Sequence, residues 1–167
     1  RWDITPDDSA GLPLQLTAPG RFLRHIADLF CEPLDAERLL VLLRHPLCNF
    51  ERGNHGLHTN ALELEVRRYG PPFPTEDSLA SWAHRTKKRY PDRIDWVHWV
   101  STTLLNIEET KPLELCQFYD AHLKISESLA AGPDTNGSGN LWKKGAGREA
   151  LRLMSELRIH LDAGGVM

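Results

Sequence analysis

Residues 18–47 constrain the fold more than any other stretch, because they carry the pattern of two amphipathic helices joined at a proline. The apolar positions of the first segment recur three and four residues apart, at Phe22, Leu23, Ile26, Leu29 and Phe30. Pro33 cannot continue this helix. Asp35 is a favourable N-cap for the second segment, with Leu34 and Leu39 placed to form a hydrophobic staple. No strand-like alternation competes, so the stretch predicts a helical core.

The other apolar residues also follow helical periodicity, and proline, glycine and capping residues divide them into segments. The further predicted helices cover about residues 57–69, 75–90, 92–107, 110–131 and 147–163. For the helix over residues 57–69 the predicted inward-facing residues are Leu57, Ala61, Leu64 and Tyr69. For the helix over residues 147–163 they are Ala150, Met154, Leu157 and Leu161.

The predicted fold class is therefore all-α, with about seven helices in an irregular orthogonal bundle that forms one domain over residues 1–167. Residues 1–17 are expected to form an extended lead-in, residues 18–163 the helical core, and residues 132–140 a flexible loop. Because the chain begins with Arg1 rather than methionine, we expect it to be a piece excised from a longer protein.

The composition is that of an ordinary soluble domain, with 41% hydrophobic and 26% charged residues. The net charge of −3 gives no overall attraction to nucleic acid, so any DNA contact must come from local basic patches. No apolar run approaches the ~18 residues of a membrane-spanning helix, and there is no signal peptide, which predicts no membrane contact and a cytoplasmic location. Cys31, Cys48 and Cys116 indicate free thiols, with Cys31 and Cys116 expected to be buried beside apolar helix positions.

Nucleotide-binding and catalytic motifs find little support. Residues 145–150, GAGREA, match the letters of GxGxxG/A, but that motif follows a β-strand and the preceding GSGN does not form one. We therefore interpret them as the start of a helix. No GxxxxGK[ST] phosphate-binding loop and no GxSxG nucleophile elbow occurs. Paired carboxylates such as Glu76 and Asp77 fall at helix starts, where capping explains them. The sequence assigns no catalytic or cofactor-binding residue.

His55 and His58 are three residues apart and lie near His45 and Cys48 in the sequence, and these side-chain types can bind a metal ion. Zinc sites usually combine two closely spaced ligand pairs, and a second pair is missing here. Exposed loop histidines are the favoured interpretation, and we assign no metal ligand. His122 lies on the apolar face of a predicted helix and is expected to be a hydrogen-bonded core histidine.

Two clusters of basic residues are the remaining functional candidates, one at a predicted helix joint and one at the start of the last predicted helix. The candidate DNA-contact residues are Arg85, Lys87, Lys88, Arg89 and Arg93 in the first cluster, and Lys143, Lys144 and Arg148 in the second. Lysine and arginine contact phosphates irrespective of base sequence. A charge run is also typical of a merely solvated face, and both interpretations stay open at this point.

Short segments along the chain resemble, in the same order, motifs of AddB of the alphaproteobacterial type. The family motifs are DSAG-x-PL…T…GRFL, LLALLKHPL and the later LW-x-GE-x-GEAL. The corresponding segments are DDSAGLPL (7–14), Thr17, GRFL (20–23), LLVLLRHPL (39–47), LW (141–142) and GREA (147–150). The matches span nearly the whole chain, although the stretch from Pro71 to Ile107 carries no matching motif.

The resemblance implies a non-catalytic helical segment of the AddB subunit of an AddAB helicase–nuclease, which processes double-strand DNA breaks for recombinational repair. AddB resembles a superfamily I helicase without ATP-binding motifs, and this segment would correspond to a helical accessory insertion. The implied partners are an AddA-type helicase subunit and, through the complex, DNA. The iron–sulfur cluster and nuclease metal of the family lie outside these residues, so no cofactor is implied in this segment. At Lys143, Lys144 and Arg148 the family tends to acidic residues, so the charge of this surface is not carried over.

Two other classes of function remain open. The chain can be a stand-alone helical protein–protein interaction domain without a role on DNA. It can also be a small metal- or nucleotide-dependent enzyme, a hypothesis that depends on His55, His58 and the GxG letters.

Overall fold

The computed structural model describes residues 11–49, 53–107, 114–133 and 137–164, and within these ranges the chain is all-helical and contains no strand. This confirms the all-α prediction and its number of helices. The elements in chain order are the 3-10 turn η1 (Leu14–Leu16), α1 (Ala18–Asp28), α2 (Ala36–Leu43), α3 (His55–Tyr69), α4 (Glu76–Thr86), α5 (Arg93–Leu104), the 3-10 turn η2 (Leu105–Ile107), α6 (Leu115–Ala131) and α7 (Lys144–Gly164).

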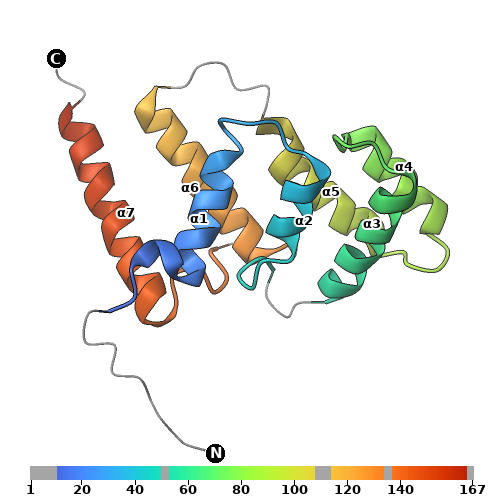
Figure 1. Ribbon diagram of the computed structural model, residues 1–167, viewed down its shortest axis with the longest axis horizontal. Helices are drawn as coiled ribbons and strands as arrows, with labels where there is room; N and C mark the ends of the chain where they lie inside the picture. The colour runs from blue at the N-terminus through green and yellow to red at the C-terminus, as the bar shows by residue number, and fades with distance from the viewer. Residues whose placement is uncertain (1–10, 50–52, 108–113, 134–136, 165–167) are drawn as a thin grey trace, which may run out of the picture.

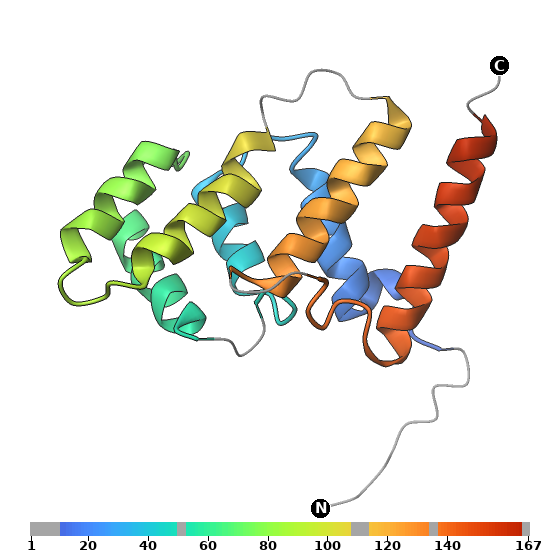
Figure 2. The same cartoon turned by 180° about the vertical axis from the view of Figure 1, so that it is seen from behind.

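The helices form two layers along the long axis of the molecule (Figures 1 and 2). The chain runs through α1, α2 and α3 in one layer and returns through α4, α5 and α6 in the other, so that α1 packs against α6 and α3 against α5. Helix α7 lies at one end, in contact with α1 and α6. None of the described helices combines the length and the apolar character needed to cross a membrane.

Local capping sets several helix starts as the sequence predicts. The Asp35 carboxylate accepts a hydrogen bond from the Arg38 N–H at 2.8 Å and begins α2. At α4, the Thr75 hydroxyl accepts from the Ser78 N–H at 3.2 Å while the Ser78 hydroxyl accepts from the Thr75 N–H at 3.0 Å, which completes a capping box. Asp92 precedes α5 in the predicted position, but its side chain makes no cap hydrogen bond.

Helix α5 is central to the core, as its two tryptophans predict. Trp96 and Trp99 are buried, and their ring centroids lie 6.4 Å apart. Leu34 and Leu39, the predicted staple, both belong to the same hydrophobic core. The His122 side chain is also buried and hydrogen-bonds through Nε2 to the Leu23 carbonyl at 2.8 Å, which joins α6 to α1 and confirms the predicted core histidine.

The predicted inward face of α3 is wrong at three of its four residues, and only Ala61 packs against the core. Leu57, Leu64 and Tyr69 are 46%, 55% and 78% exposed, whereas His58 and Leu62 are buried. The helix is rotated because the imidazole of His58 is hydrogen-bonded to residues at the start of α5, so a polar residue takes a core position.

The predicted inward face of α7 is confirmed in part. Ala150 is buried and Met154 and Leu161 are half-buried, but Leu157 is 48% exposed, because α7 lies at the end of the layers and has neighbours on one side only. The cysteine prediction also needs correction, since Cys31 is exposed and the fully buried thiol is Cys48.

Several element boundaries also differ from the sequence predictions. Leu14–Leu16 form a 3-10 turn inside the lead-in that was expected to be extended. Helix α4 ends at Thr86 rather than near Tyr90, and α7 begins at Lys144 rather than Gly147. Thr110, the predicted start of the sixth helix, lies outside the described residues.

Candidate functional site

The connection between α4 and α5 presents most of the first basic cluster to solvent. Lys87, Lys88 and Arg89 are exposed, and among the residues that the structure describes no carboxylate forms an ion pair with any of them. Arg85 differs, because its guanidinium is paired with Glu65 of α3. Three adjacent, unneutralised cations therefore project from this connection.

Arg93 does not belong to this exposed surface, which corrects its prediction as a DNA contact. It is 2% exposed, and its guanidinium carbon lies 4.4 Å from the ring centroids of both Trp82 and Tyr90. Its Nη1 donates a hydrogen bond to the Thr86 hydroxyl at 2.8 Å. Arg93 thus joins the two ends of the α4–α5 connection from inside the protein.

A chain of hydrogen bonds extends from Arg93 to α3. Arg93 Nε donates to His58 Nδ1 at 3.4 Å, so His58 Nε2 carries the hydrogen that is directed at Asp92 Oδ2, 3.0 Å away. Asn54 Nδ2 donates to the same oxygen at 2.7 Å. The hydrogen bond from Asn54, followed by that from His58, lowers the pKa of the Asp92 carboxyl, which stays ionised. We infer that these hydrogen bonds fix the start of α5 against α3 and thereby restrict the connection that carries Lys87, Lys88 and Arg89.

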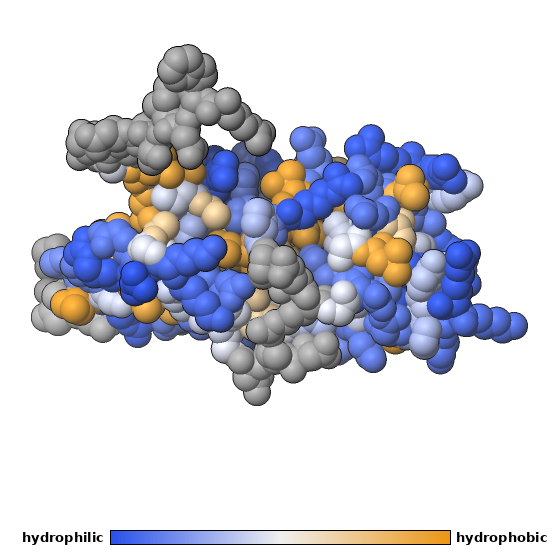
Figure 3. Space-filling model, turned by 90° about the horizontal axis from the view of Figure 1, so that it is seen from below, coloured by the Kyte–Doolittle hydropathy of each residue, from blue (hydrophilic) through white to orange (hydrophobic). Residues whose placement is uncertain are grey.

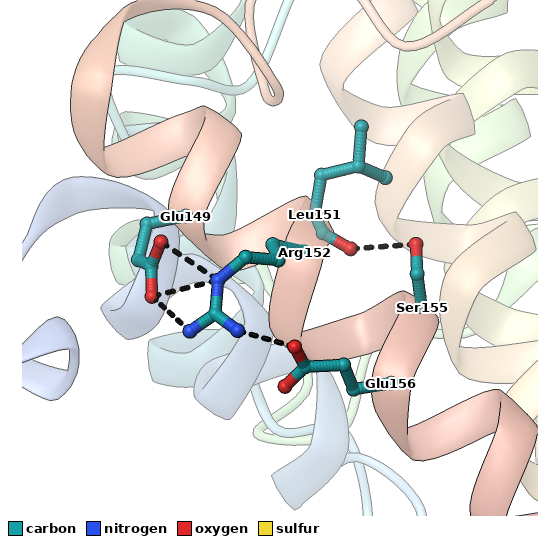
Figure 4. Close-up of polar contacts among 5 residues, drawn as sticks. All are labelled: Glu149, Leu151, Arg152, Ser155 and Glu156. Atoms are coloured by element: carbon teal, nitrogen blue, oxygen red, sulfur yellow. Dashed lines mark hydrogen bonds and ion pairs between the residues drawn. The ribbon is translucent and has the colours of Figure 1, made fainter.

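The second basic cluster lies at the start of α7. Lys143, Lys144 and Arg148 are exposed, and Lys143 Nζ donates to Asn140 Oδ1 at 2.8 Å. Arg152, one turn further, is neutralised by two carboxylates of the same helix, Glu149 and Glu156 (Figure 4).

The structure does not bring the two basic clusters together. The α4–α5 connection and the start of α7 lie at opposite ends of the long axis (Figure 1). In the view from below, hydrophilic residues predominate at the outer edge of the end that carries α3 and α4, and hydrophobic residues form small separate patches on both halves of the molecule (Figure 3). A single ligand that contacts both clusters must therefore span the length of the molecule.

The GxG letters have a packing explanation. Residues 145–150 lie in the first turns of α7, and the described residues before them, 137–143, contain turns and no strand. A side chain at Gly147 would bring a Cβ within 2.6 Å of the Leu141 carbonyl oxygen. Glycine is therefore explained there by the close approach of α7 to the preceding turn.

Both histidines of the suggested metal pattern are engaged in hydrogen bonds. His55 Nε2 is bonded to the Leu43 carbonyl at 2.7 Å, and its Nδ1 accepts from Trp96 Nε1 at 3.0 Å. His58 is bonded through both ring nitrogens, as described above. Within the described part of the chain no group of three or more His, Cys, Asp or Glu side chains is placed to hold a metal ion.

Three partly or fully buried histidines are expected to make stability depend on pH. Burial lowers the pKa of His45 to about 4, with a further contribution from His25 and Arg21, and burial also lowers the pKa of His55 and His122. In the unfolded chain these groups titrate near pH 6.5, whereas in the folded protein they take up protons only at lower pH, so the unfolded state binds more protons as the pH falls below 6.5. The free energy of unfolding should therefore be highest above pH 6.5 and should decrease as the pH is lowered below 6.5. The decrease is about 1.4 kcal/mol per pH unit for each histidine that is protonated in the unfolded chain but neutral in the folded protein.

Urea denaturation at a series of pH values from 7.5 to 4.5 measures this dependence. As a control, His122→Gln keeps an N–H donor for the Leu23 carbonyl but cannot titrate. It should therefore reduce the slope of the free energy of unfolding against pH by the contribution of one histidine. A free energy of unfolding that stays constant over this range would contradict the assignment of neutral histidines.

Sequence reasoning missed a groove on the outer side of the α1, α2 and α3 layer. Its volume is about 720 Å³, and its lining combines aliphatic side chains with basic ones from all three helices. The basic residues of the lining are Arg21, His25, Arg44, His45 and Arg67. They are spread over 47 positions of sequence from Arg21 to Arg67 and form no charge run, so no local signal marks them.

Comparison of the chain with protein-family models, with curated proteins and with solved structures finds no match.

Proposed function

We propose that this chain is a non-catalytic helical segment of an AddB-type subunit of a helicase–nuclease and that it contacts DNA during the processing of double-strand breaks. The observation that carries the DNA contact is the row of three exposed cations at Lys87, Lys88 and Arg89, none of which pairs with a carboxylate of the described residues. The ordered sequence motifs support the assignment to AddB. In this proposal the protein acts in the cytoplasm, with an AddA-type helicase subunit as its partner.

The geometry favours contact with the phosphate backbone rather than with bases. Lys87, Lys88 and Arg89 lie on a connection and not on a helix face that could enter a groove of DNA. Arg93 takes part only by holding the connection in place. The residues Lys143, Lys144 and Arg148 offer a second, separate phosphate contact at the other end of the molecule.

Fluorescence anisotropy with a labelled duplex tests this proposal. Replacing Lys87, Lys88 and Arg89 by alanine should weaken binding by about tenfold or more at low salt, because three phosphate contacts are lost. The matched control replaces Arg24, Arg68 and Lys124, three exposed cations elsewhere, by alanine and thus changes the net charge equally. Equal binding by wild type and both variants would contradict the assigned contact.

A protein–protein interaction domain without a DNA role is the second candidate, and the α1–α2–α3 groove is the observation that favours it. This alternative predicts that the wild-type chain shows no salt-dependent binding to either single- or double-stranded DNA. The same anisotropy measurement therefore distinguishes the two functions.

A further inference from the structure

We propose that the groove between α1, α2 and α3 binds an acidic amphipathic segment of another protein, with apolar side chains on the groove floor and carboxylates at its basic rim. This interaction is distinct from the proposed DNA contact, because none of the residues that line the groove belongs to the α4–α5 connection or to the start of α7.

The groove has an aliphatic part, which we call its floor. It consists of the half-buried Ala36 and Leu40 and the exposed Val41 of α2, with the half-buried Val66 of α3. Val41 is 41% exposed, although it lies on a helix whose opposite face is fully buried in the core. A partly exposed apolar strip between helices is the surface on which an amphipathic helix places its own apolar face.

The rim of the groove carries an excess of positive charge. Glu63 is paired with both Arg44 and Arg67, so this carboxylate is already neutralised. Glu37 is the other carboxylate of the lining, which leaves the three arginines with one more charge than the two glutamates.

At the α1 side, Arg21 and His25 line the groove beside His45. Burial lowers the pKa of His45, and the nearby Arg21 guanidinium contributes in the same direction, as a neighbouring cation does. A carboxylate on a partner would complement this side of the groove.

The chemistry of the floor favours a peptide over single-stranded nucleic acid. Proteins bind single strands by stacking bases on aromatic side chains, and the floor formed by Ala36, Leu40, Val41 and Val66 is aliphatic. A groove with an aliphatic floor and a charged rim is complementary to an amphipathic helix that carries leucines at positions i, i+3, i+4 and i+7 and charged residues beside them.

The test uses the whole chain and a labelled, helix-forming peptide of about 16 residues that carries leucine at i, i+3, i+4 and i+7 and glutamate at flanking positions. We expect saturable binding by anisotropy that weakens as salt is raised. Arg21→Glu and Val41→Glu should each lower the affinity about tenfold, the first by reversing rim charge and the second by placing a carboxylate on the apolar floor.

Two matched variants control for non-specific effects. Arg24→Glu reverses an exposed charge on α1, and Leu57→Glu replaces an exposed leucine on α3, and neither residue lines the groove. Both should bind the peptide within about twofold of wild type. Circular dichroism melts confirm that all four variants remain folded, as expected for exposed positions.

Three outcomes would overturn the proposal. The first is equal binding of a peptide of the same composition with its leucines distributed around the helix, because the apolar floor then plays no part. The second is loss of affinity in the control variants as large as in Arg21→Glu and Val41→Glu. The third is displacement of the peptide by a single-stranded oligonucleotide of equal charge at equal concentration, which indicates a general anion surface. The Lys87, Lys88 and Arg89 alanine variant should bind the peptide normally, so failure here is distinguishable from failure of the DNA proposal.

Discussion

Replacing Gly132 by alanine is expected to destabilise the fold by about 2–6 kcal/mol and to lower the melting temperature by roughly 4–24 °C. Gly132 ends α6 with φ +84° and ψ −179°, a conformation that is almost restricted to glycine and that costs a residue with a Cβ about 1–3 kcal/mol. An added Cβ would also lie 2.5 Å from Cγ of Asn49. Overpacking of this kind typically costs a further 1–3 kcal/mol, and differential scanning calorimetry measures the sum.

Asn49 cannot move away at low cost. It is 3% exposed, and its N–H donates to the Leu129 carbonyl of α6 at 2.9 Å. The variant Gly56→Ala is the matched control, because Gly56 lies in α3 with open space around its Cα. It should be neutral or stabilise by up to about 1 kcal/mol through helix propensity. A Gly132→Ala protein as stable as Gly56→Ala would show that this contact does not constrain the fold.

Replacing Arg93 by alanine is expected to destabilise the protein by about 3–5 kcal/mol. The substitution removes the guanidinium between Trp82 and Tyr90 and leaves His58 Nδ1 without its donor. Because Arg93 is buried, the vacated volume cannot fill without movement of the two rings. Urea denaturation measures the change in the free energy of unfolding.

Two variants separate packing from charge at this position. Arg93→Met keeps an apolar chain of similar length between the rings and should lose less than half as much stability as Arg93→Ala. Arg89→Ala, at an exposed position four residues earlier, should change stability by about 0.5 kcal/mol or less. If Arg93→Ala were as stable as Arg89→Ala, Arg93 would not hold the connection. Folded Arg93→Met should bind DNA within about twofold of wild type, because Arg93 does not reach the surface.

The helices could be predicted from sequence because their signals are local. Asp35 and Thr75 begin helices through hydrogen bonds to backbone groups three residues away, so their effect needs no knowledge of the fold. Gly70 and Gly132 follow the last residues of α3 and α6, where the sequence predicts that these helices end.

The buried faces and the site could not be predicted as completely, because they depend on neighbours distant in sequence. Arg93 resembles an exposed cation within a basic run, and only the packing of α3 and α4 around it explains its burial. The groove between α1, α2 and α3 has no local signal either, since its residues meet only when three helices lie side by side.

The most direct test of the proposed DNA contact is the salt dependence of duplex binding by the wild-type chain and by the Lys87, Lys88 and Arg89 alanine variant. A plot of the logarithm of the binding constant against the logarithm of salt concentration has a slope of about −0.9 for each neutralised phosphate. If the three side chains each contact one phosphate, the slope of the variant should be smaller in magnitude by about 2–3. Identical slopes for the two proteins would contradict a DNA surface at the α4–α5 connection.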